Sequence, residues 1–376
     1  MYANYSVANP TGDRRDELDL IQRINKKIRS LLLGAAHFTP TPRSNVDQPA
    51  AFAGDLGRAI RDLKIESDDH IFFHTADGST YLGLSRLVET MIPDKLPTVH
   101  IVTPYDPVGV MPNCDDPEKI AEAVRSFEEQ GLRGKNIFLY GENELLAKHL
   151  ASLWSVPVRS LLIPAAPAEP TEIESAKAYR RDFLGLDEGA FVVVSLGSAR
   201  MEKGFDLLPD IIQNTLKKTG NKVKFVLHAS PQIIGRHPVI AETIDKLGRF
   251  DHARVRLLLN PLSLTDYRSL LLASDAVMLP YNKTDYLVRS SAVVSEAISS
   301  GKILIATADT YPGMAAIAAG GLTASTPSEF GAAISYATEN RKSMQKSAMN
   351  ARDRYLQENS ISDYVKKAIR YTQSGV

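Results

Sequence analysis

Short apolar runs alternate with amphipathic patterns along the first half of the chain. The spacing of apolar positions predicts strands over residues 71–74, 99–103, 137–140 and 158–163, with helices between them over residues 81–91, 118–130 and 142–154. Strands that alternate with helices in this way are typical of parallel βαβ units. The first half is therefore predicted to form an α/β structure around one parallel sheet.

The second half repeats this alternation. Its predicted strands cover residues 191–196, 223–228, 255–259, 276–279 and 303–306, and near-continuous apolar runs such as 191–194 favour strands covered on both faces. Between the halves, Pro164, Pro167 and Pro170 disfavour helix and strand and indicate a linker. We predict an α/β fold with two Rossmann-like domains, residues 1–165 and 166–376, facing across a cleft. The last helix is expected to pack back on the first domain.

A further helix is predicted near the N-terminus. Residues 20–32 place apolar side chains at helical spacing behind Asp13, a candidate N-cap. The cations on its polar face would suit anionic lipid, but a solvated polar face over a core stripe is the commoner cause of this pattern. We expect at most peripheral contact with the inner face of a membrane.

Composition restricts the class of partner. The 376 residues are 44% hydrophobic, which suffices for two cores, and 44 Lys plus Arg balance 44 Asp plus Glu. With no net field, a nucleic-acid partner is not expected, and small molecules are. Neither a secretory signal nor an apolar run of about 18 residues is present, and the single cysteine, Cys114, excludes an internal disulfide framework. We expect a cytoplasmic protein in which Cys114 is a plain thiol.

A glycine and two cations follow the first predicted strand of the second domain. Gly197 permits close backbone approach, and Arg200 and Lys203 offer charge-assisted hydrogen bonds just before a helix predicted to begin near Phe205. Residues 197–204 are thus a candidate diphosphate site. They match neither the Walker pattern nor the dinucleotide fingerprint, which argues against kinases and hydride-transfer enzymes. A solvated turn that holds two cations is the alternative.

A second motif follows the predicted strand 276–279. Ser290 or Ser291 can cap a helix whose free amides attract an anion, and Glu296 lies about a turn and a half further in. There a carboxylate can accept both hydroxyls of a ribose while the phosphates sit at the helix tip. Apolar residues flank Glu296, so an unpaired carboxylate would be costly, which favours a ligand over an ordinary exposed helical glutamate.

These motifs together resemble those of the retaining glycosyltransferases of family four, which have the GT-B architecture. The resemblance rests on Gly197 with Glu202-Lys203-Gly204, on residues 273–281 and on residues 296–302, and covers about residues 185–310. It implies that Lys203 and Arg200 bind the donor diphosphate and act in catalysis, and that Glu296 contacts the ribose. It also implies that His74, at the end of the first predicted strand, is the active-site histidine. A strand-end histidine satisfied by local backbone is the alternative.

The chain departs from the family pattern at several positions. Ser198 replaces the arginine that usually follows the glycine, so Arg200 would reach the diphosphate from two positions later. The family's first glutamate, eight positions before Glu296, is Val288 here, and Asp285 is a candidate substitute for its contact with the sugar.

Two further features complete the comparison with the family. Some family members share the run Arg289-Ser290-Ser291, which we include in the predicted donor site. Nothing before Asp13 resembles the family's opening strand and Gly-rich loop. Either the chain starts after that pair or the run from Gly34 to His37 replaces it, and we favour the first.

The resemblance implies an enzyme that moves a sugar from a nucleoside diphosphate sugar to an acceptor hydroxyl with retention, as in bacterial surface polysaccharide synthesis. The acceptor would be a glycan or lipid-linked. No cofactor or metal is expected, since the nucleotide sugar is itself the donor and His37, His100 and His228 lack metal-ligand spacing. Two alternatives stay open. Val288 and the irregular N-terminus suggest a catalytically silent nucleotide-sugar-binding or scaffold protein, and a GT-B-fold nucleotide-sugar epimerase would need acid and base residues that are not evident.

Overall fold

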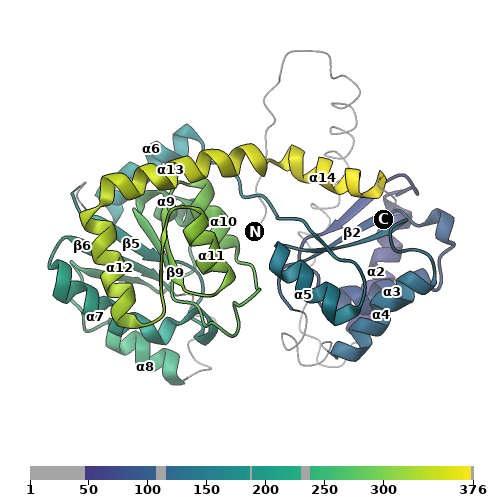
Figure 1. The fold of residues 1–376 in the computed structure, drawn as a ribbon, viewed down its shortest axis with the longest axis horizontal. Coiled ribbons are helices and arrows are strands. Elements are labelled where there is room, and N and C mark those ends of the chain that lie inside the picture. The colour runs from purple at the N-terminus through teal and green to yellow at the C-terminus, as the bar shows by residue number, and fades with distance from the viewer. Residues whose placement is uncertain (1–46, 107–115, 187–188, 230–237, 374–376) are drawn as a thin grey trace, which may run out of the picture. The chain divides into compact units, whose positions relative to one another are not determined.

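A computed structural model describes residues 47–106, 116–186, 189–229 and 238–373 (Figure 1). The predicted helix over residues 20–32, Cys114 and the run from Gly34 to His37 lie outside these ranges. The described chain divides into two compact units. The C-terminal unit covers residues 163–364, and the N-terminal unit contains the described residues up to 162 together with those from 365 onward.

The N-terminal unit contains a four-stranded sheet in the order β1-β2-β3-β4, with every pairing parallel. Its strands are β1 (His70–Phe73), β2 (Thr98–Thr103), β3 (Ile137–Gly141) and β4 (Arg159–Ser160). Its helices include α2 (Gln48–Asp62), α3 (Gly78–Val88), α4 (Pro117–Glu129) and α5 (Glu144–Trp154). Asp77, Asp116 and Asn143 cap α3, α4 and α5 with side-chain oxygens, which explains where these helices begin. Strand β4 pairs only with β3 and is much shorter than the predicted run 158–163.

The C-terminal unit has a six-stranded parallel sheet in the order β10-β9-β8-β5-β6-β7. The strands are β5 (Phe191–Ser195), β6 (Val223–His228), β7 (Val255–Leu258), β8 (Ala276–Leu279), β9 (Ile303–Thr307) and β10 (Leu322–Ala324). The chain runs from β5 outward to β7, returns to β8 on the other side of β5, and then runs outward to β10. The switch point therefore lies at the carboxyl ends of β5 and β8, where doubly wound sheets bind ligands.

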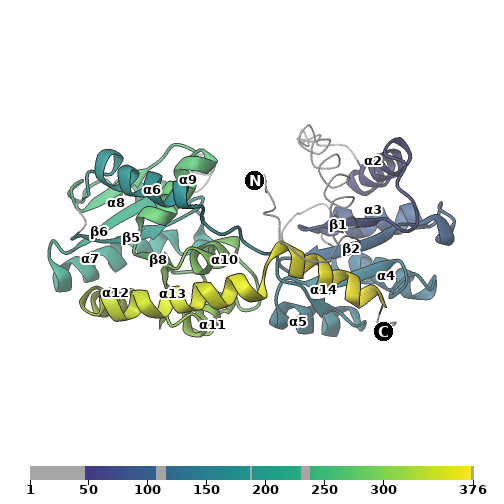
Figure 2. The same ribbon diagram turned by 90° about the horizontal axis from the view of Figure 1, so that it is seen from above.

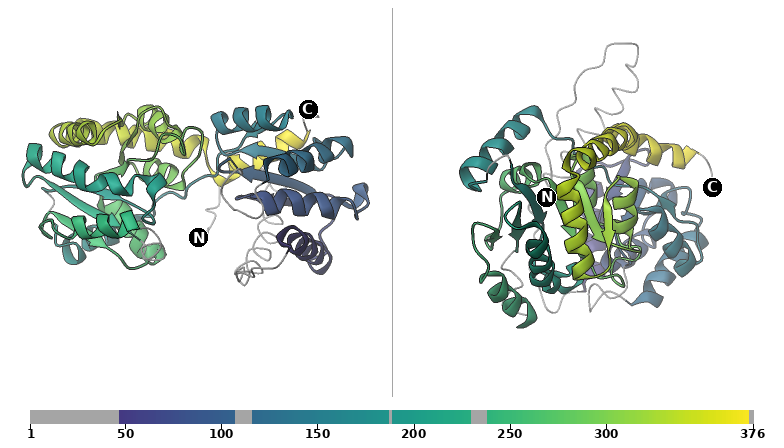
Figure 3. Two further views of the ribbon diagram at one scale, coloured as in Figure 1. Left: turned by 90° about the horizontal axis from the view of Figure 1, so that it is seen from below. Right: turned by 60° about the vertical axis from the view of Figure 1, so that its left-hand side comes forward.

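Helices cover both faces of this sheet, as Figures 2 and 3 show from three directions. They are α6 (Pro170–Ala178), α7 (Leu208–Thr219), α8 (Pro238–Leu247), α9 (Leu264–Ala273), α10 (Ala292–Ser299), α11 (Tyr311–Ala318), α12 (Pro327–Glu339) and α13 (Arg341–Glu358), after which α14 (Ile361–Gln373) ends the described chain. Pro170 was predicted to lie in a linker but is the first residue of α6, a position where its missing N–H is not needed.

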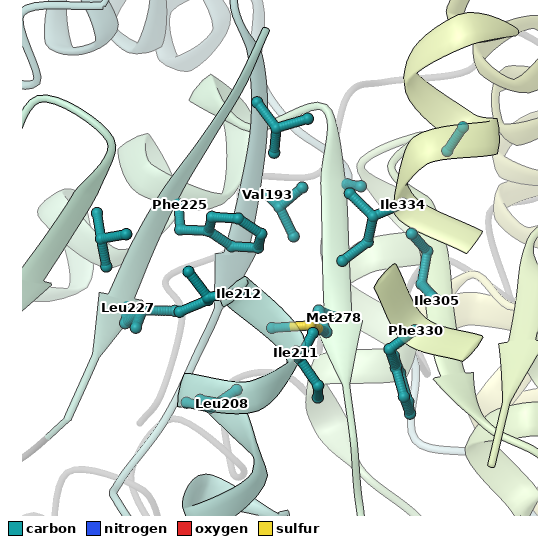
Figure 4. Packing of buried hydrophobic residues seen from close by; sticks show 14 of the residues in the cluster. Val193, Leu208, Ile211, Ile212, Phe225, Leu227, Met278, Ile305, Phe330 and Ile334 are labelled. Atoms are coloured by element: carbon teal, nitrogen blue, oxygen red, sulfur yellow. The ribbon is translucent and has the colours of Figure 1, made fainter. Parts of the chain in front are cut away.

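The core explains why strands such as β5 are apolar throughout. On one face Val193 packs with Phe225 and with residues of α7 and α12, as Figure 4 shows. On the other face Val192 and Val194 pack with residues of α9 and α10. Successive strand residues point to opposite faces, so both must be apolar when helices cover both. The two-sided burial expected from residues 191–194 is confirmed.

Candidate functional site

The residues after β5 place a lysine directly over a glycine. Gly197 has φ +113°, and a Cβ built there would lie 2.6 Å from the Nζ atom of Lys203. Lys203 ends a 3₁₀ turn, Met201–Lys203, and Gly204 (φ +63°) follows it in contact with the carbonyl of Pro280 at the end of β8. The turn is therefore held between the ends of β5 and β8. A second 3₁₀ turn, Phe205–Leu207, comes next, so α7 begins at Leu208 rather than near Phe205 as predicted.

Lys203 is the centre of a charged cluster. The pKa of Lys203 is lowered to about 8, chiefly by burial and also by repulsion from Arg200 and Arg289, whereas Glu202 and Glu296 oppose the shift. The Nζ atom lies 5.8 Å from the ring centroid of Tyr281, which is buried. Arg200 forms an ion pair with Glu202 at 3.0 Å. Burial and the neighbouring cations both disfavour the charged ammonium, so an anionic ligand at this site would be stabilising.

Glu296 enters the cluster from α10. It is largely buried, and the Tyr267 hydroxyl on α9 donates a 2.5 Å hydrogen bond to its Oε2 atom. Burial raises the pKa of Glu296, while the Tyr267 hydrogen bond and the charges of Arg268 and Lys203 oppose that rise. The structure thus brings Glu296 close enough to Lys203 for direct electrostatic interaction, as the two motifs predicted.

The run before α10 lies at the same edge. Ser291 is the N-cap residue by position, but its side chain makes no capping hydrogen bond to any described residue, which differs from the predicted capping role. Ser290 is buried, and its Oγ atom makes no hydrogen bond within the described chain. The guanidinium of Arg289 lies 5.0 Å from the ring centroid of Tyr286. Ser198 is half-buried in the loop after Gly197.

Several polar atoms around Lys203 are buried and have no hydrogen-bond partner in the described part of the protein. They are Arg200 Nε, both ring nitrogens of His228 and Ser290 Oγ. Buried polar atoms in folded proteins are nearly always paired, so each exception requires an explanation. From the sequence, His228 was excluded only as a metal ligand, because it matched no metal-ligand spacing. Its position as the last residue of β6, the strand beside β5, is the only sequence signal that could have selected it.

Asp285 lies beside the turn that carries Lys203. It lines a pocket of about 250 Å³ together with Glu202, Gly204, Asp206 and Asn282. Asp285 itself is exposed, and Val288, at the position of the family's first glutamate, is half-buried. The structure thus places Asp285 beside two other carboxylates.

His74 belongs to the N-terminal unit. It directly follows β1, is exposed, and stacks on Phe72 with ring centroids 5.9 Å apart. On the same face, His70 Nδ1 lies 2.9 Å from His100 Nε2, and His100 Nδ1 lies 3.0 Å from the Tyr140 hydroxyl. Both nitrogens of the fully buried His100 are therefore paired.

Comparison with known proteins starts from these two parallel sheets. No protein-family model matches the chain, and no curated protein matches it in sequence. Solved structures do match: a UDP-forming alpha,alpha-trehalose-phosphate synthase from Burkholderia xenovorans, in complex with glucose-6-phosphate, is 14% identical with a TM-score of 0.64 over 87% of this chain and 77% of that one.

Two further solved structures also match this chain. HepE from Anabaena, in complex with UDP, is 13% identical with a TM-score of 0.62 over 86% of this chain and 82% of its own. A glycosyltransferase from Rickettsia africae is 12% identical with a TM-score of 0.62 over 90% and 84%. The fold is that of GT-B glycosyltransferases. The predicted fold class is confirmed, whereas likeness at this identity carries no assignment to family four.

Within this GT-B fold, the cluster around Lys203 lies at the switch point of the C-terminal sheet. Among the described residues, no group of three or more His, Cys, Asp or Glu side chains could hold a metal ion. In the same part of the chain, no helix is both long and apolar enough to cross a membrane. The cluster around Lys203 offers cations, an N–H donor and a helix N-terminus to an anion. It also offers a carboxylate to hydroxyl groups.

Proposed function

We propose that the protein is a glycosyltransferase that moves a sugar from a nucleoside diphosphate sugar to an acceptor hydroxyl with retention at the anomeric carbon. The proposal rests on one observation above all. In a GT-B fold, buried polar atoms of Arg200, His228 and Ser290 lack hydrogen-bond partners among the described residues and lie near Lys203 at the switch point of the C-terminal sheet. A bound diphosphate would pair them, because phosphate oxygens accept several hydrogen bonds at once.

Each part of the cluster has a role in this proposal. Lys203 and Arg200, with Arg289 and the N-terminus of α10 after Ser290 and Ser291, hold the diphosphate. Glu296 accepts hydrogen bonds from the ribose hydroxyls, with its carboxylate oriented by the phenol of Tyr267. Gly197 lets the phosphate approach because any side chain there would displace the Lys203 ammonium.

The proposed reaction exchanges one bond at the anomeric carbon. The bond from that carbon to the phosphate oxygen breaks and its electron pair stays with the leaving diphosphate. A bond to the acceptor oxygen forms, and the proton of the acceptor hydroxyl passes to the leaving diphosphate. Negative charge develops on the leaving diphosphate, where Lys203 and Arg200 stabilise it. His74 is proposed to orient the donor sugar. The reaction so described requires no cofactor or metal.

The donor is proposed from the similar solved structures, and the acceptor from the family resemblance of the sequence. HepE binds UDP and the synthase is UDP-forming, so a uridine nucleotide is the first candidate. A glycan or lipid-linked acceptor, in surface polysaccharide synthesis, is proposed on the family resemblance of the sequence. Asp285 is kept as a candidate contact for the transferred sugar.

The test measures binding first and turnover second. Calorimetric titration with UDP, GDP and ADP should give one clear binder, and Lys203→Ala should raise its dissociation constant by about 10- to 100-fold, since a hydrogen bond to a charged group contributes about 1.5–3 kcal/mol. Lys283→Ala is the matched control, because Lys283 is exposed and pairs with Asp309 on the surface. Release of nucleoside diphosphate from the matching nucleotide sugar should also fall in Lys203→Ala. Equal effects of the two alanine variants would refute the proposed site.

One observation favours a second function. Val288 has no polar group with which to hold a sugar hydroxyl at the position where the family has its first glutamate. A catalytically silent nucleotide-sugar-binding protein would bind the diphosphate through Lys203 but release no product from any nucleotide sugar, with or without an acceptor. That result would support this second function over the first.

A further inference from the structure

The imidazole of His228 stands at the edge of the sheet where the diphosphate is proposed to bind. It is the last residue of β6, and Leu227, just before it, pairs with Ser195 at the end of β5. Neighbouring strands lie about 4.8 Å apart, so His228 is level with the residues that lead into Gly197. The charge of Lys203 lowers the pKa of His228, so the two side chains lie within electrostatic range of each other.

The hydrogen bonding of His228 is incomplete. Both ring nitrogens are buried, and neither makes a hydrogen bond of normal geometry to any residue that the structure describes. A buried donor or acceptor without a partner costs about 1–3 kcal/mol. His100 supplies an internal comparison, because that buried histidine pairs one nitrogen with His70 and the other with Tyr140. His100 is therefore paired at both ring nitrogens, and His228 is not.

The surroundings of His228 indicate what its partner is. Burial lowers the pKa of His228, a hydrogen-bonding backbone group of Asn260, outside normal geometry, opposes the shift, and the Lys203 ammonium adds to it. The free ring is thus neutral at pH 7 and carries one N–H next to a cation. An anion with more than one acceptor oxygen would satisfy both the ammonium and this N–H, and a phosphate is such a group.

We propose that His228 is a further ligand-binding residue of the donor site and donates a hydrogen bond to the phosphate group held by Lys203. This inference rests on the proposed function. The phosphate then has three neighbours from three segments: the backbone at Gly197, the Lys203 ammonium and the His228 imidazole. Because the bound anion favours a protonated imidazole, binding near pH 7 should also take up a proton at His228.

The test compares variants of His228 across ligands that differ only in phosphate. Titrations with UDP, UMP and uridine, or with the same series of a better-binding base, should show that His228→Leu raises the dissociation constant of the diphosphate by about 10-fold or more. The dissociation constant of the nucleoside should not change. His228→Gln, which keeps an N–H donor, should recover part of the loss. His252→Leu is the matched control, since His252 is exposed in the same unit.

A stability measurement separates this role from a structural one. His228→Leu removes an unpaired buried ring, so the unliganded variant should melt at or above the wild-type temperature. His100→Leu, by contrast, breaks two hydrogen bonds and should melt lower. Calorimetry in two buffers of different ionisation enthalpy at pH 7 should show proton uptake with UDP in the wild type and less in His228→Gln.

Each contrary outcome has a distinct meaning. An unchanged dissociation constant for UDP in His228→Leu overturns this inference and leaves the proposed function intact. Equal losses for uridine and UDP overturn it as well, because they place the ring at the nucleoside. If the wild-type protein binds none of the nucleoside diphosphates, the proposed function and this inference both fail.

Discussion

Gly197→Ala is the substitution that tests most directly how the site is built. The added Cβ would lie 2.6 Å from Lys203 Nζ, which is the end of a flexible side chain and can move away. The backbone is at φ +113°, where a non-glycine residue costs about 1–3 kcal/mol. Two effects are therefore expected: a fall of about 1–3 kcal/mol in the free energy of unfolding, and displacement of the ammonium from the proposed phosphate position.

The second effect should be visible in binding. Loss of the charged hydrogen bond corresponds to about 1.5–3 kcal/mol, so the dissociation constant of the nucleoside diphosphate should rise by about 10- to 100-fold. Denaturant unfolding measures the first effect and calorimetric titration the second.

Gly185→Ala is the control for this prediction. Gly185 also has positive φ (+62°), but a Cβ there meets no atom within 4 Å. The control should lose about 1–2 kcal/mol of stability through its backbone alone and keep its affinity. If Gly197→Ala binds the diphosphate as tightly as Gly185→Ala does, the close approach of a phosphate to Gly197 is wrong.

Two further predictions concern groups near Gly197, and a third concerns a buried ion pair elsewhere in the C-terminal unit. Tyr267→Phe should weaken the binding of UDP several-fold but leave the binding of 2′,3′-dideoxy-UDP unaffected, because the phenol acts through Glu296 on the ribose hydroxyls. Titration of both ligands measures this difference. Lys203 has a pKa of about 8 in the free protein, and a bound phosphate favours its charged form. The affinity for UDP should therefore fall as the pH rises above 8. Titrations from pH 7 to 9.5 should show this fall in the wild type and not in Lys203→Met. Asp275→Asn should lower the free energy of unfolding by about 3–5 kcal/mol, because it leaves the buried Arg180 without its charge partner, whereas Asp353→Asn, in an exposed pair, should change it by less than about 1 kcal/mol. Urea unfolding distinguishes the last two variants.

The sequence predicted the layers of the fold well because burial on both faces leaves a strong pattern. All five strands predicted in the C-terminal unit agree with the structure to within one residue at each end, and β5 shows why, since Val192 and Val193 enter different cores. Strand β10 was missed, because a three-residue strand after Gly320 and Gly321 leaves no periodicity to detect. The strand order, and with it the switch point, depends on pairings between distant segments that no local pattern records.

The candidate site was predictable where its residues are neighbours in the chain. Gly197 and Lys203 lie six positions apart and form one local turn, so their types and spacing pointed to an anion. Tyr267 and His228 could not be selected in this way. Tyr267 is selected by its hydrogen bond to Glu296 on another helix, and His228 by the lack of a partner among the described residues. Only the folded structure shows which polar atoms are paired.

The C-terminal unit contains two buried charged clusters, at opposite ends of its strands, and their difference bears on function. At the amino ends, Asp275 accepts hydrogen bonds from Arg180, Arg341 and the backbone N–H of Val192, so the buried carboxylate is fully paired. At the carboxyl ends, burial lowers the pKa of Lys203 and raises that of Glu296, while the His228 nitrogens have no partner among the described residues. The same polypeptide thus completes one buried cluster and leaves the other incomplete. Buried polar groups without partners lower the stability of the free protein. A ligand that carries both an anion and hydroxyl donors would provide partners for these groups at once. A nucleoside diphosphate has both, which is why its binding should raise the melting temperature more than inorganic pyrophosphate or the nucleoside alone.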